Sequence, residues 1–315
     1  MNAFTASAPS SIGNVGPGFD VLGLAVDGPA DRVTASAADH ADIRITSIIG
    51  AEGLPTDPTK NTAGIAAEHT RRAAGQPNAG IDLVIEKAIP LASGLGGSAS
   101  SAAAAAFAVN QLLGSPLRTA ELIGPCVEAE ASVAGRHADN VAPALLGGLV
   151  LVLDLEGQPR VQRLPVPRDL VVVVVTPRVA LATKSARDVL PKQIPLAARS
   201  RNASKIAGFV SACYAGDVGQ LSGCVEDDVV ETARLPLIPG GPGALDAARR
   251  AGAIGASISG AGPSIFAMCH STVVANTVRD RMVGAFRAEG IESDAIVSPG
   301  ACPGASLVRD GGARP

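Results

Sequence analysis

Hydrophobic and polar residues follow each other along this chain in patterns that predict both strands and helices. Ile81, Leu83 and Ile85 lie on one face of an alternating segment that ends at Lys87, which indicates a half-buried strand. Residues 4–26 are predicted to hold a short strand, a glycine-rich turn and an apolar segment. Further strands are predicted over 31–49, 147–155, 170–176, 256–258, 265–268 and 293–297. Helices are predicted over 62–74, 98–113, 117–132, 184–190, 199–215, 218–230, 243–251 and 273–289. From these patterns alone, the chain is a mixture of helices and strands.

Prolines and glycines divide this pattern. The proline-rich stretch 159–167 is the expected junction between two domains, an N-terminal one over 1–160 and a C-terminal one over 161–315. A length of 315 residues suits two domains of ordinary size. Beyond Pro299 the chain is again rich in glycine and proline, so we expect a loosely held tail.

Composition excludes several classes of function. The formal net charge is −3, only 2% of residues are aromatic and tryptophan is absent, which argues against a nucleic-acid partner. The five cysteines form no C-x-x-C pair, and the four histidines have no zinc-binding spacing. No signal peptide is evident, and the longest aliphatic run is too short to span a bilayer. We therefore expect a cytoplasmic protein without a membrane partner.

The most informative segment is a glycine-rich loop that runs directly into an alanine-rich helix, residues 90–114. Gly94, Gly96 and Gly97 let the backbone bend sharply and approach a ligand, and Ser98 follows them. The N-terminus of a helix has free N–H groups and a partial positive charge, so this segment suits a phosphate group.

Several kinds of glycine loop compete for this segment. A P-loop requires a Lys-Ser or Lys-Thr pair, and no lysine lies between Lys87 and Lys184. Residues 94–99 fit the dinucleotide pattern G-x-G-x-x-A, but the expected second strand with its acidic residue is replaced by more helix. A mobile glycine linker is the least specific alternative.

Residues 90–99 resemble the signature P-x-x-x-G-L-G-S-S-A of the GHMP kinase superfamily, named for kinases of galactose, homoserine, mevalonate and phosphomevalonate. Gly97 departs from the usual serine. The resemblance implies that the ATP phosphates bind to the whole segment, namely Pro90, Leu91, Ala92, Ser93, Gly94, Leu95, Gly96, Gly97, Ser98, Ala99 and Ser100.

A second motif, S-S-I-G-N-V-G-P-G-F-D, lies near the N-terminus. Taken alone, Asn14 and Asp20 would be polar residues that satisfy backbone donors in a tight turn. The segment resembles the pattern P-x-S-x-x-N-x-G-x-G-F-D of the homoserine kinase family. That resemblance implies that both side chains face an amino-acid substrate, with Asn14 aligning the reacting hydroxyl and Asp20 a candidate for the ammonium group.

The third motif covers residues 128–148 and contains H-A-D-N-V-A-P-A-L-L-G-G, which also resembles the homoserine kinases. Glu130 could hold Mg²⁺ together with the hydroxyl of Ser98, because this hard cation prefers oxygen ligands. Glu128 is the alternative ligand, and a solvated helix face is the alternative role of Glu130. Asp139 is a candidate for the substrate ammonium, or else a helix N-cap, and Asn140 is a second candidate for aligning the hydroxyl.

Two arginines and a glycine turn complete the set. Arg187 lies in a T-x-x-x-R segment and Arg234 in E-x-x-R-x-x-L-I-P-G, and alone each would be read as a surface arginine. The family resemblance implies that both bind the substrate carboxylate, for which a planar guanidinium is well suited. The turn S-G-A-G-P-S, residues 259–264, is a hairpin turn by itself. By resemblance, it packs against the phosphate loop.

The four motifs resemble one family in one order, which implies an α+β fold of two domains. The N-terminal domain would be like domain 2 of ribosomal protein S5 and the C-terminal domain ferredoxin-like, with ATP and L-homoserine in the cleft between them. The resemblance implies phosphorylation of homoserine with ATP and Mg²⁺ in threonine biosynthesis, and suggests a homodimer by analogy.

No general base stands out, and the Asp–Lys pair of some relatives is not located in the sequence. The alternatives are a GHMP kinase for an isoprenoid or sugar alcohol, a non-catalytic sensor and a dehydrogenase.

Overall fold

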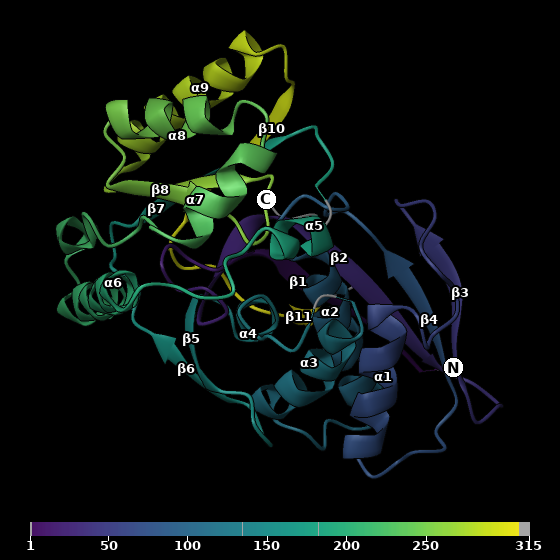
Figure 1. The fold of residues 1–315 in the computed structure, drawn as a ribbon. Coiled ribbons are helices and arrows are strands. Elements are labelled where there is room, and N and C mark those ends of the chain that lie inside the picture. Colours follow the sequence, from purple (N-terminus) through teal and green to yellow (C-terminus); the bar gives the residue numbers. More distant parts are fainter. Residues whose placement is uncertain (1, 134, 182, 309–315) are drawn as a thin grey trace.

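Two β-sheets with helices packed against them build this protein (Figure 1). The computed structural model describes residues 2–133, 135–181 and 183–308. Within these residues the first sheet has seven strands and the second has four. The sequence prediction of a two-domain α+β protein is thereby confirmed.

The first sheet is built around two long antiparallel strands, β1 (Ala3–Gly13) and β2 (Leu22–Ala37). Its main order is β11-β1-β2-β4-β3, and β5 pairs with both β2 and β6. Only β3 and β4 are parallel; the other pairs are antiparallel. The remaining strands are β3 (Ile43–Ile49), β4 (Ile81–Glu86), β5 (Leu149–Asp154), β6 (Arg160–Leu164) and β11 (Ser306–Leu307).

Helices of the first half cover this sheet. They are α1 (Thr62–Ala73), α2 (Gly97–Leu112), the 3₁₀ turn η1 (Thr119–Leu122), α3 (Ile123–Ala131) and α4 (Val141–Leu146). The alanines of α2 are fully buried, so this helix lies close to β1 and β2. Its small side chains favour both the helix and the close approach. The predicted strand 81–87 and helices 62–74 and 98–113 are confirmed within one residue at each end.

The second sheet has the order β10-β7-β9-β8, with every pair antiparallel. Its strands are β7 (Val171–Pro177), β8 (Gly255–Ile258), β9 (Ile265–Cys269) and β10 (Ser293–Pro299). Helices α8 (Gly241–Arg250) and α9 (Thr272–Ala288) cover one face of this sheet (Figure 1). The other elements of this half are α5 (Thr183–Asp188), α6 (Leu196–Ala215), η2 (Val218–Leu221), α7 (Val230–Arg234) and η3 (Leu235–Leu237).

A shared apolar cluster joins the two halves. Ile12 and Leu22 of the first sheet pack with Phe266 and Met268 of the second and with Phe209 of α6. All five are fully buried. This common core therefore fixes how the two halves of the protein pack against each other.

Two sequence predictions were wrong in the second half. The helix expected over 218–230 is only the short turn η2, and the chain then bends at Gly223, whose φ is +74°. Helix α7 begins at Val230, because the carboxylate of Asp227 accepts the N–H groups of Val229 and Val230. In this segment Gly223 and Asp227 favour the end of one helical turn and the start of a new helix, so a single continuous helix does not form.

The second wrong prediction concerns the tail, at least for residues 300–308. Strand β11 pairs with β1, and Cys302 is buried with its carbonyl accepting the N–H of Gly148. Backbone pairing rather than side-chain pattern holds this segment. Residues 309–315 of the predicted tail lie outside the described residues.

The expected junction at 159–167 contains β6, which pairs with β5 in the first sheet. The chain then passes to the second sheet at β7 and returns to the first at β11. A boundary at residue 160 thus falls at the first residue of β6, and the division into 1–160 and 161–315 stays a prediction.

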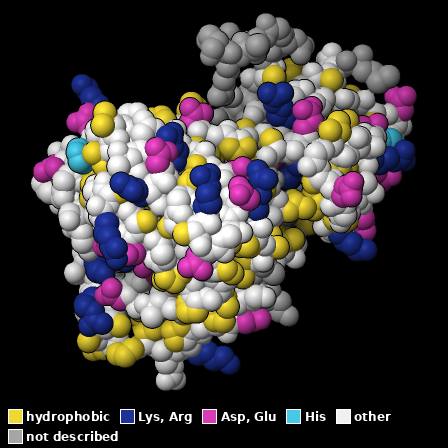
Figure 2. Space-filling model, turned by 90° about the horizontal axis from the view of Figure 1, so that it is seen from above, with side chains coloured by type: hydrophobic (Ala, Val, Ile, Leu, Met, Phe, Trp, Pro, Cys, Tyr) yellow, Lys and Arg dark blue, Asp and Glu magenta, His cyan; other side chains and the backbone are white. Residues whose placement is uncertain are grey.

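Charged side chains of both signs are interspersed on the face shown in Figure 2, without a broad region of one sign. No helix among the described residues is long and apolar enough to cross a membrane.

Candidate active site

A cavity of about 350 Å³ lies where the two halves meet. The first half contributes the glycine loop, the start of α1 and the segment before α4, and the second half contributes Arg187, Arg234, Gly260 and Ala261. Its volume lies in the range of small-molecule binding sites. The lining includes most of the predicted site residues: Asn14, Asp20, Pro90, Leu91, Ala92, Ser93, Gly94, Gly96, Gly97, Ser98, Glu130, Asp139, Asn140, Arg187 and Arg234.

The glycine loop has the backbone that its sequence predicts. Gly94 and Gly96 have φ values of +78° and +67°, which are strained for residues with a side chain. A Cβ atom on Gly94 would lie 2.7 Å from the carbonyl oxygens of Ser259 and Gly262. Helix α2 begins at Gly97 without a side-chain cap, so its first N–H groups face the cavity without an intrahelical partner. Such a terminus attracts anions.

Three predicted loop residues have another role. Leu95, Ala99 and Ser100 are buried and do not line the cavity. Leu95 belongs to the cluster between the sheets, Ala99 packs in the core under α2, and the hydroxyl of Ser100 donates to the carbonyl of Ala8. Their side chains hold the loop from behind, so any phosphate contact from these three residues would come from their backbone and not from their side chains.

The glycine turn between β8 and β9 packs on the phosphate loop, as the sequence resemblance implied. The hydroxyl of Ser259 donates to the carbonyl of Gly94 at 2.7 Å, and that of Ser264 donates to the carbonyl of Ser93 at 2.6 Å. The two domains are thus hydrogen-bonded to each other directly at the loop.

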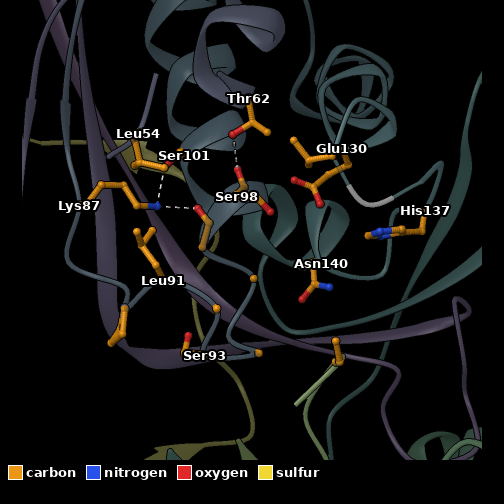
Figure 3. A pocket seen from close by; sticks show the side chains of 18 of the residues that line it. Leu54, Thr62, Lys87, Leu91, Ser93, Ser98, Ser101, Glu130, His137 and Asn140 are labelled. Atoms are coloured by element: carbon orange, nitrogen blue, oxygen red, sulfur yellow. Dashed lines mark hydrogen bonds between the residues drawn. The ribbon is translucent and has the colours of Figure 1, made fainter. Parts of the chain in front are cut away.

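Glu130 of α3 points toward Ser98 in the cavity (Figure 3). Its side chain is buried, and its Oε1 atom has no hydrogen-bond partner among the residues that the structure describes. Burial raises the pKa of this carboxyl, against the opposing effects of His137 and a hydrogen bond from Ser98. Glu128 instead lies at the surface and pairs with Arg136. The structure therefore favours Glu130 over Glu128 as a metal ligand.

These two oxygen donors fit a magnesium ion. No group of three or more His, Cys, Asp or Glu that could hold a metal occurs in the described part of the chain. Mg²⁺ commonly takes one or two protein oxygens and completes its shell with phosphate oxygens and water. An unpartnered buried carboxylate oxygen beside a serine at the phosphate loop matches that requirement.

The N-terminal glycine turn is held in a strained conformation. Asn14 and Asp20 have φ values of +54° and +57°. The N–H of Asp20 donates to Oδ1 of Asn14 at 2.8 Å, and the N–H of Asn14 donates to Oδ2 of Asp139 at 2.8 Å. The side chain of Asn14 thus satisfies a backbone donor, as the simpler interpretation predicted, whereas the carboxylate of Asp20 accepts from Arg187. Both residues also line the cavity.

Asp139 and Asn140 are more constrained than the sequence suggested. Asp139 is 1% exposed, and its Oδ1 lies 3.2 Å from Nδ1 of His137. Burial opposes the charge on His137, but Asp139, Glu130 and Asp20 together outweigh burial and raise its pKa. The Oδ1 atom of Asn140 accepts the hydroxyl of Ser11 at 3.0 Å. Helix α4 has Asn140 as its N-cap without a side-chain bond, so the N-cap interpretation of Asp139 is wrong.

The two predicted arginines lie together at the other end of the cavity. Nη2 of Arg187 donates to Oδ1 of Asp20 at 3.2 Å. Arg234 is 1% exposed and donates to the carbonyls of Ala186 and Gly260, both at 2.9 Å. Burial, and then the charge of Arg187, lower the pKa of Arg234. A buried cation beside a second cation is a ready site for an anion.

The ring of Phe19 lies close to both guanidinium groups. Its centroid is 5.6 Å from Cζ of Arg187 and 5.3 Å from Cζ of Arg234. Both distances lie within the range of cation–π attraction. The ring thus supports the two like-charged groups from one side.

Sequence reasoning missed four site residues. The hydroxyl of Thr62 donates to the carbonyl of Ser98 at 3.2 Å (Figure 3). Lys87 lies below the phosphate loop, Phe19 contacts the arginines, and His137 pairs with Asp139. Phe19 and His137 stand inside the motifs quoted above, so their positions in those motifs were the available signal. For Thr62 and Lys87 the sequence contained no signal of a role in the site, apart from their positions at the ends of predicted elements.

Comparison with protein families gives two matches in this chain. The GHMP kinases N terminal domain matches residues 61–148, and the GHMP kinases C terminal domain matches residues 209–288. The first match contains the phosphate loop and Glu130, and the second contains Arg234 and the glycine turn.

Individual proteins are similar over nearly the whole chain. A homoserine kinase of Chlorobaculum tepidum is 39% identical, covering 98% of this chain and 99% of its own. A homoserine kinase of Xylella fastidiosa is 41% identical, covering 96% of this chain and 93% of its own. The crystal structure of homoserine kinase from Cytophaga hutchinsonii superimposes with a TM-score of 0.94 at 40% identity, covering 98% of each chain.

Proposed function

Because this chain belongs to the homoserine kinase family of the GHMP kinases, we propose that it transfers the γ-phosphoryl group of ATP to the side-chain hydroxyl of L-homoserine. The products are ADP and O-phospho-L-homoserine, an intermediate of threonine biosynthesis. The observation that carries this proposal is the composition of one cavity, with a phosphate-binding helix terminus at one end and two arginines beside an aspartate at the other.

The phosphate end binds ATP. The free N–H groups at the start of α2 and its dipole stabilise the phosphates. Ser98 and Glu130 would hold Mg²⁺, which neutralises charge on the transferring group when it is bound. Burial raises the pKa of Glu130 and so disfavours its charged form, and a bound cation would oppose this effect.

The arginine end binds the amino acid. Arg187 and Arg234 form charge-assisted hydrogen bonds to the substrate carboxylate. Asp20 is partly exposed in the cavity and is suited to the ammonium group. Asp139 is more deeply buried and already accepts the N–H of Asn14, so we assign it mainly to holding the turn. This division of roles revises the equal candidacy of the two aspartates.

The reaction forms a bond from the homoserine oxygen to the γ-phosphorus and breaks the bond to the β-phosphate bridging oxygen. Asn14 and Asn140 both line the cavity and align the hydroxyl. Against the effect of burial, the carboxylates of Asp139, Glu130 and Asp20 raise the pKa of His137 and so favour its protonated form, which cannot accept the hydroxyl proton. Catalysis thus rests on alignment and charge stabilisation, and the hydroxyl proton leaves to phosphate oxygen or water.

The rival substrates make different demands. Galactose has no carboxylate for the two arginines to bind, and mevalonate has a carboxylate but no ammonium group for Asp20. A sensor without catalysis would not need an unpartnered carboxylate beside Ser98. These observations favour an amino-acid kinase.

A panel assay tests the proposal. The protein is incubated with ATP, Mg²⁺ and either L-homoserine, mevalonate or galactose, and ADP release is measured. L-Homoserine is expected to give the highest kcat/KM, and EDTA is expected to stop turnover. Faster turnover of mevalonate or galactose would contradict the substrate assignment. Turnover of none would favour a sensor. A cytoplasmic location remains a prediction from the sequence, and a homodimer remains a prediction from analogy with the family.

A further inference from the structure

Beneath the phosphate loop lies a buried ion pair to which the reaction assigns no role. Asp31 of β2 is fully buried and the side chain of Lys87, at the end of β4, is 4% exposed. The ammonium group of Lys87 contacts the carboxylate of Asp31 and donates to the carbonyl of Gly97 and to Oγ of Ser101, both at 2.9 Å (Figure 3). The pair therefore joins the central sheet to the first turn of α2.

Every donor of this ammonium group is in use. Lysine has three N–H donors, and they are directed at Asp31, Gly97 and Ser101. Asp31 is equally saturated, because it also accepts the hydroxyl of Ser101 and the N–H groups of residues 88 and 89. Lys87 is thus not free to bind a phosphate directly, unlike the lysine of a P-loop.

The contact with Gly97 acts on the loop through a peptide group. The carbonyl of Gly97 and the N–H of Ser98 belong to one planar trans peptide, so they point in opposite directions. A cation bound to the carbonyl fixes the plane of this peptide and strengthens the N–H as a donor. Gly97 is the first residue of α2 and has no side chain to restrict it, so the contact from Lys87 adds to the helix geometry in orienting this peptide.

We infer that the Asp31–Lys87 pair positions the phosphate loop, holding the Gly97–Ser98 peptide so that its N–H is presented to the nucleotide phosphates. Lys87 is a positioning residue in this scheme and touches no substrate. The inference rests on the proposed role of the loop as the ATP phosphate site.

The test needs a variant that removes the contact from Lys87 without leaving a buried charge, and a single substitution does not provide it. Lys87→Met keeps the length of the side chain but leaves Asp31 unpaired, which can prevent folding. The double variant Asp31→Asn/Lys87→Met removes both charges, and the asparagine oxygen can still accept the N–H groups of residues 88 and 89. Lys205→Met is the matched control, because Lys205 pairs with Asp228 outside the cavity. Thermal unfolding identifies folded variants.

Calorimetry with ADP and with adenosine separates positioning from general damage. Adenosine has no phosphate, so its affinity reports the rest of the nucleotide site. In the double variant we expect ADP to bind about 10-fold more weakly or worse, as for loss of a charge-assisted hydrogen bond. Adenosine should change by less than about 2-fold, and Lys205→Met should change neither.

The outcomes separate the two proposals. If the unsubstituted protein binds ADP no more tightly than adenosine, the loop is not a phosphate site and this inference is overturned with it. If ADP is preferred but the double variant retains that preference, the loop assignment stands and the role of Lys87 is overturned. Equal weakening of both ligands would also overturn it, since it would indicate a collapsed pocket.

Discussion

The backbone N–H of Asn14 donates a 2.8 Å hydrogen bond to Oδ2 of Asp139, although 125 positions separate the two residues. The bond joins the N-terminal glycine turn to the segment before α4. It requires a glycine at position 13, where a Cβ atom would lie 2.5 Å from the same carboxylate oxygen. Two of the sequence motifs are thus parts of one structure at the cavity.

This contact predicts a graded effect of substitution at Asp139. Asp139→Ala removes the acceptor and the partner of His137, and is expected to lower the free energy of unfolding by about 1.5–3 kcal/mol. Asp139→Asn retains an oxygen acceptor and should cost less. Urea unfolding of both variants measures the difference. Equal stability of the alanine variant and the parent would show that the contact does not hold the turn.

The arginines are expected to differ in what they contribute. Arg187→Ala should raise the KM for L-homoserine by roughly 10- to 150-fold, which corresponds to about 1.5–3 kcal/mol, with little change in Tm. Arg234→Ala should raise the same KM and also lower Tm, because Arg234 is buried and bonds two carbonyls. Steady-state kinetics and thermal unfolding distinguish the two.

A control belongs to this arginine experiment. The KM for ATP should stay near the parent value in Arg187→Ala, since Arg187 lies at the amino-acid end of the cavity. Unchanged binding of L-homoserine in both variants would show that the arginines do not bind the carboxylate.

Ser98→Ala and Glu130→Gln should each lower kcat by about 10-fold or more and raise the Mg²⁺ concentration needed for half-maximal rate. Both residues are proposed to act through the metal, so the KM for L-homoserine should change little. Glu128→Gln is the matched control on the same helix, because Glu128 pairs with Arg136 at the surface. A metal dependence altered in Glu128→Gln but not in Glu130→Gln would reverse the assignment.

The raised pKa of His137 predicts a pH-dependent stability. A histidine whose pKa is higher in the folded than in the unfolded protein stabilises the fold through its protonated form. This contribution is complete below the unfolded pKa of about 6.5 and is lost as pH rises through the folded pKa. The stability difference between the parent and His137→Gln should therefore shrink with rising pH in urea unfolding. A difference that grows with pH would have the wrong sign.

A pair of glycines tests how the C-terminal segment is held. Gly147 and Gly157 have φ values of +72° and +67°, so alanine is strained at both. At Gly147 a Cβ atom would also overlap the backbone of residues 302–304, whereas at Gly157 no atom of the described residues lies within 4 Å. Gly147→Ala is expected to lose stability by more than the ~1 kcal/mol of Gly157→Ala. Equal losses of stability in the two variants would indicate that residues 302–304 shift at little cost in free energy.

Much of the local structure could be predicted from the sequence. The apolar alternation at 81–86 and the alanine-rich run after Gly97 each specify one backbone conformation with little help from distant residues. The glycines of the loop likewise predict positive φ, which Gly94 and Gly96 have. Motif resemblance then predicted which polar residues line the cavity, and most of them do.

The tertiary structure decided what periodicity does not encode. The segment around β11 has no periodic pattern of hydrophobic residues, and its order comes from backbone pairing with β1. Asp31 and Lys87 lie on strands that are adjacent in the sheet but 56 positions apart along the chain, and neither belongs to a motif. The sequence determined local conformation and the chemistry available, because backbone dihedrals depend on near neighbours. The pairing of Asp31 with Lys87 depended on strand register and on the packing of α2. These two features of the tertiary structure fix the distances between residues that are far apart in the chain.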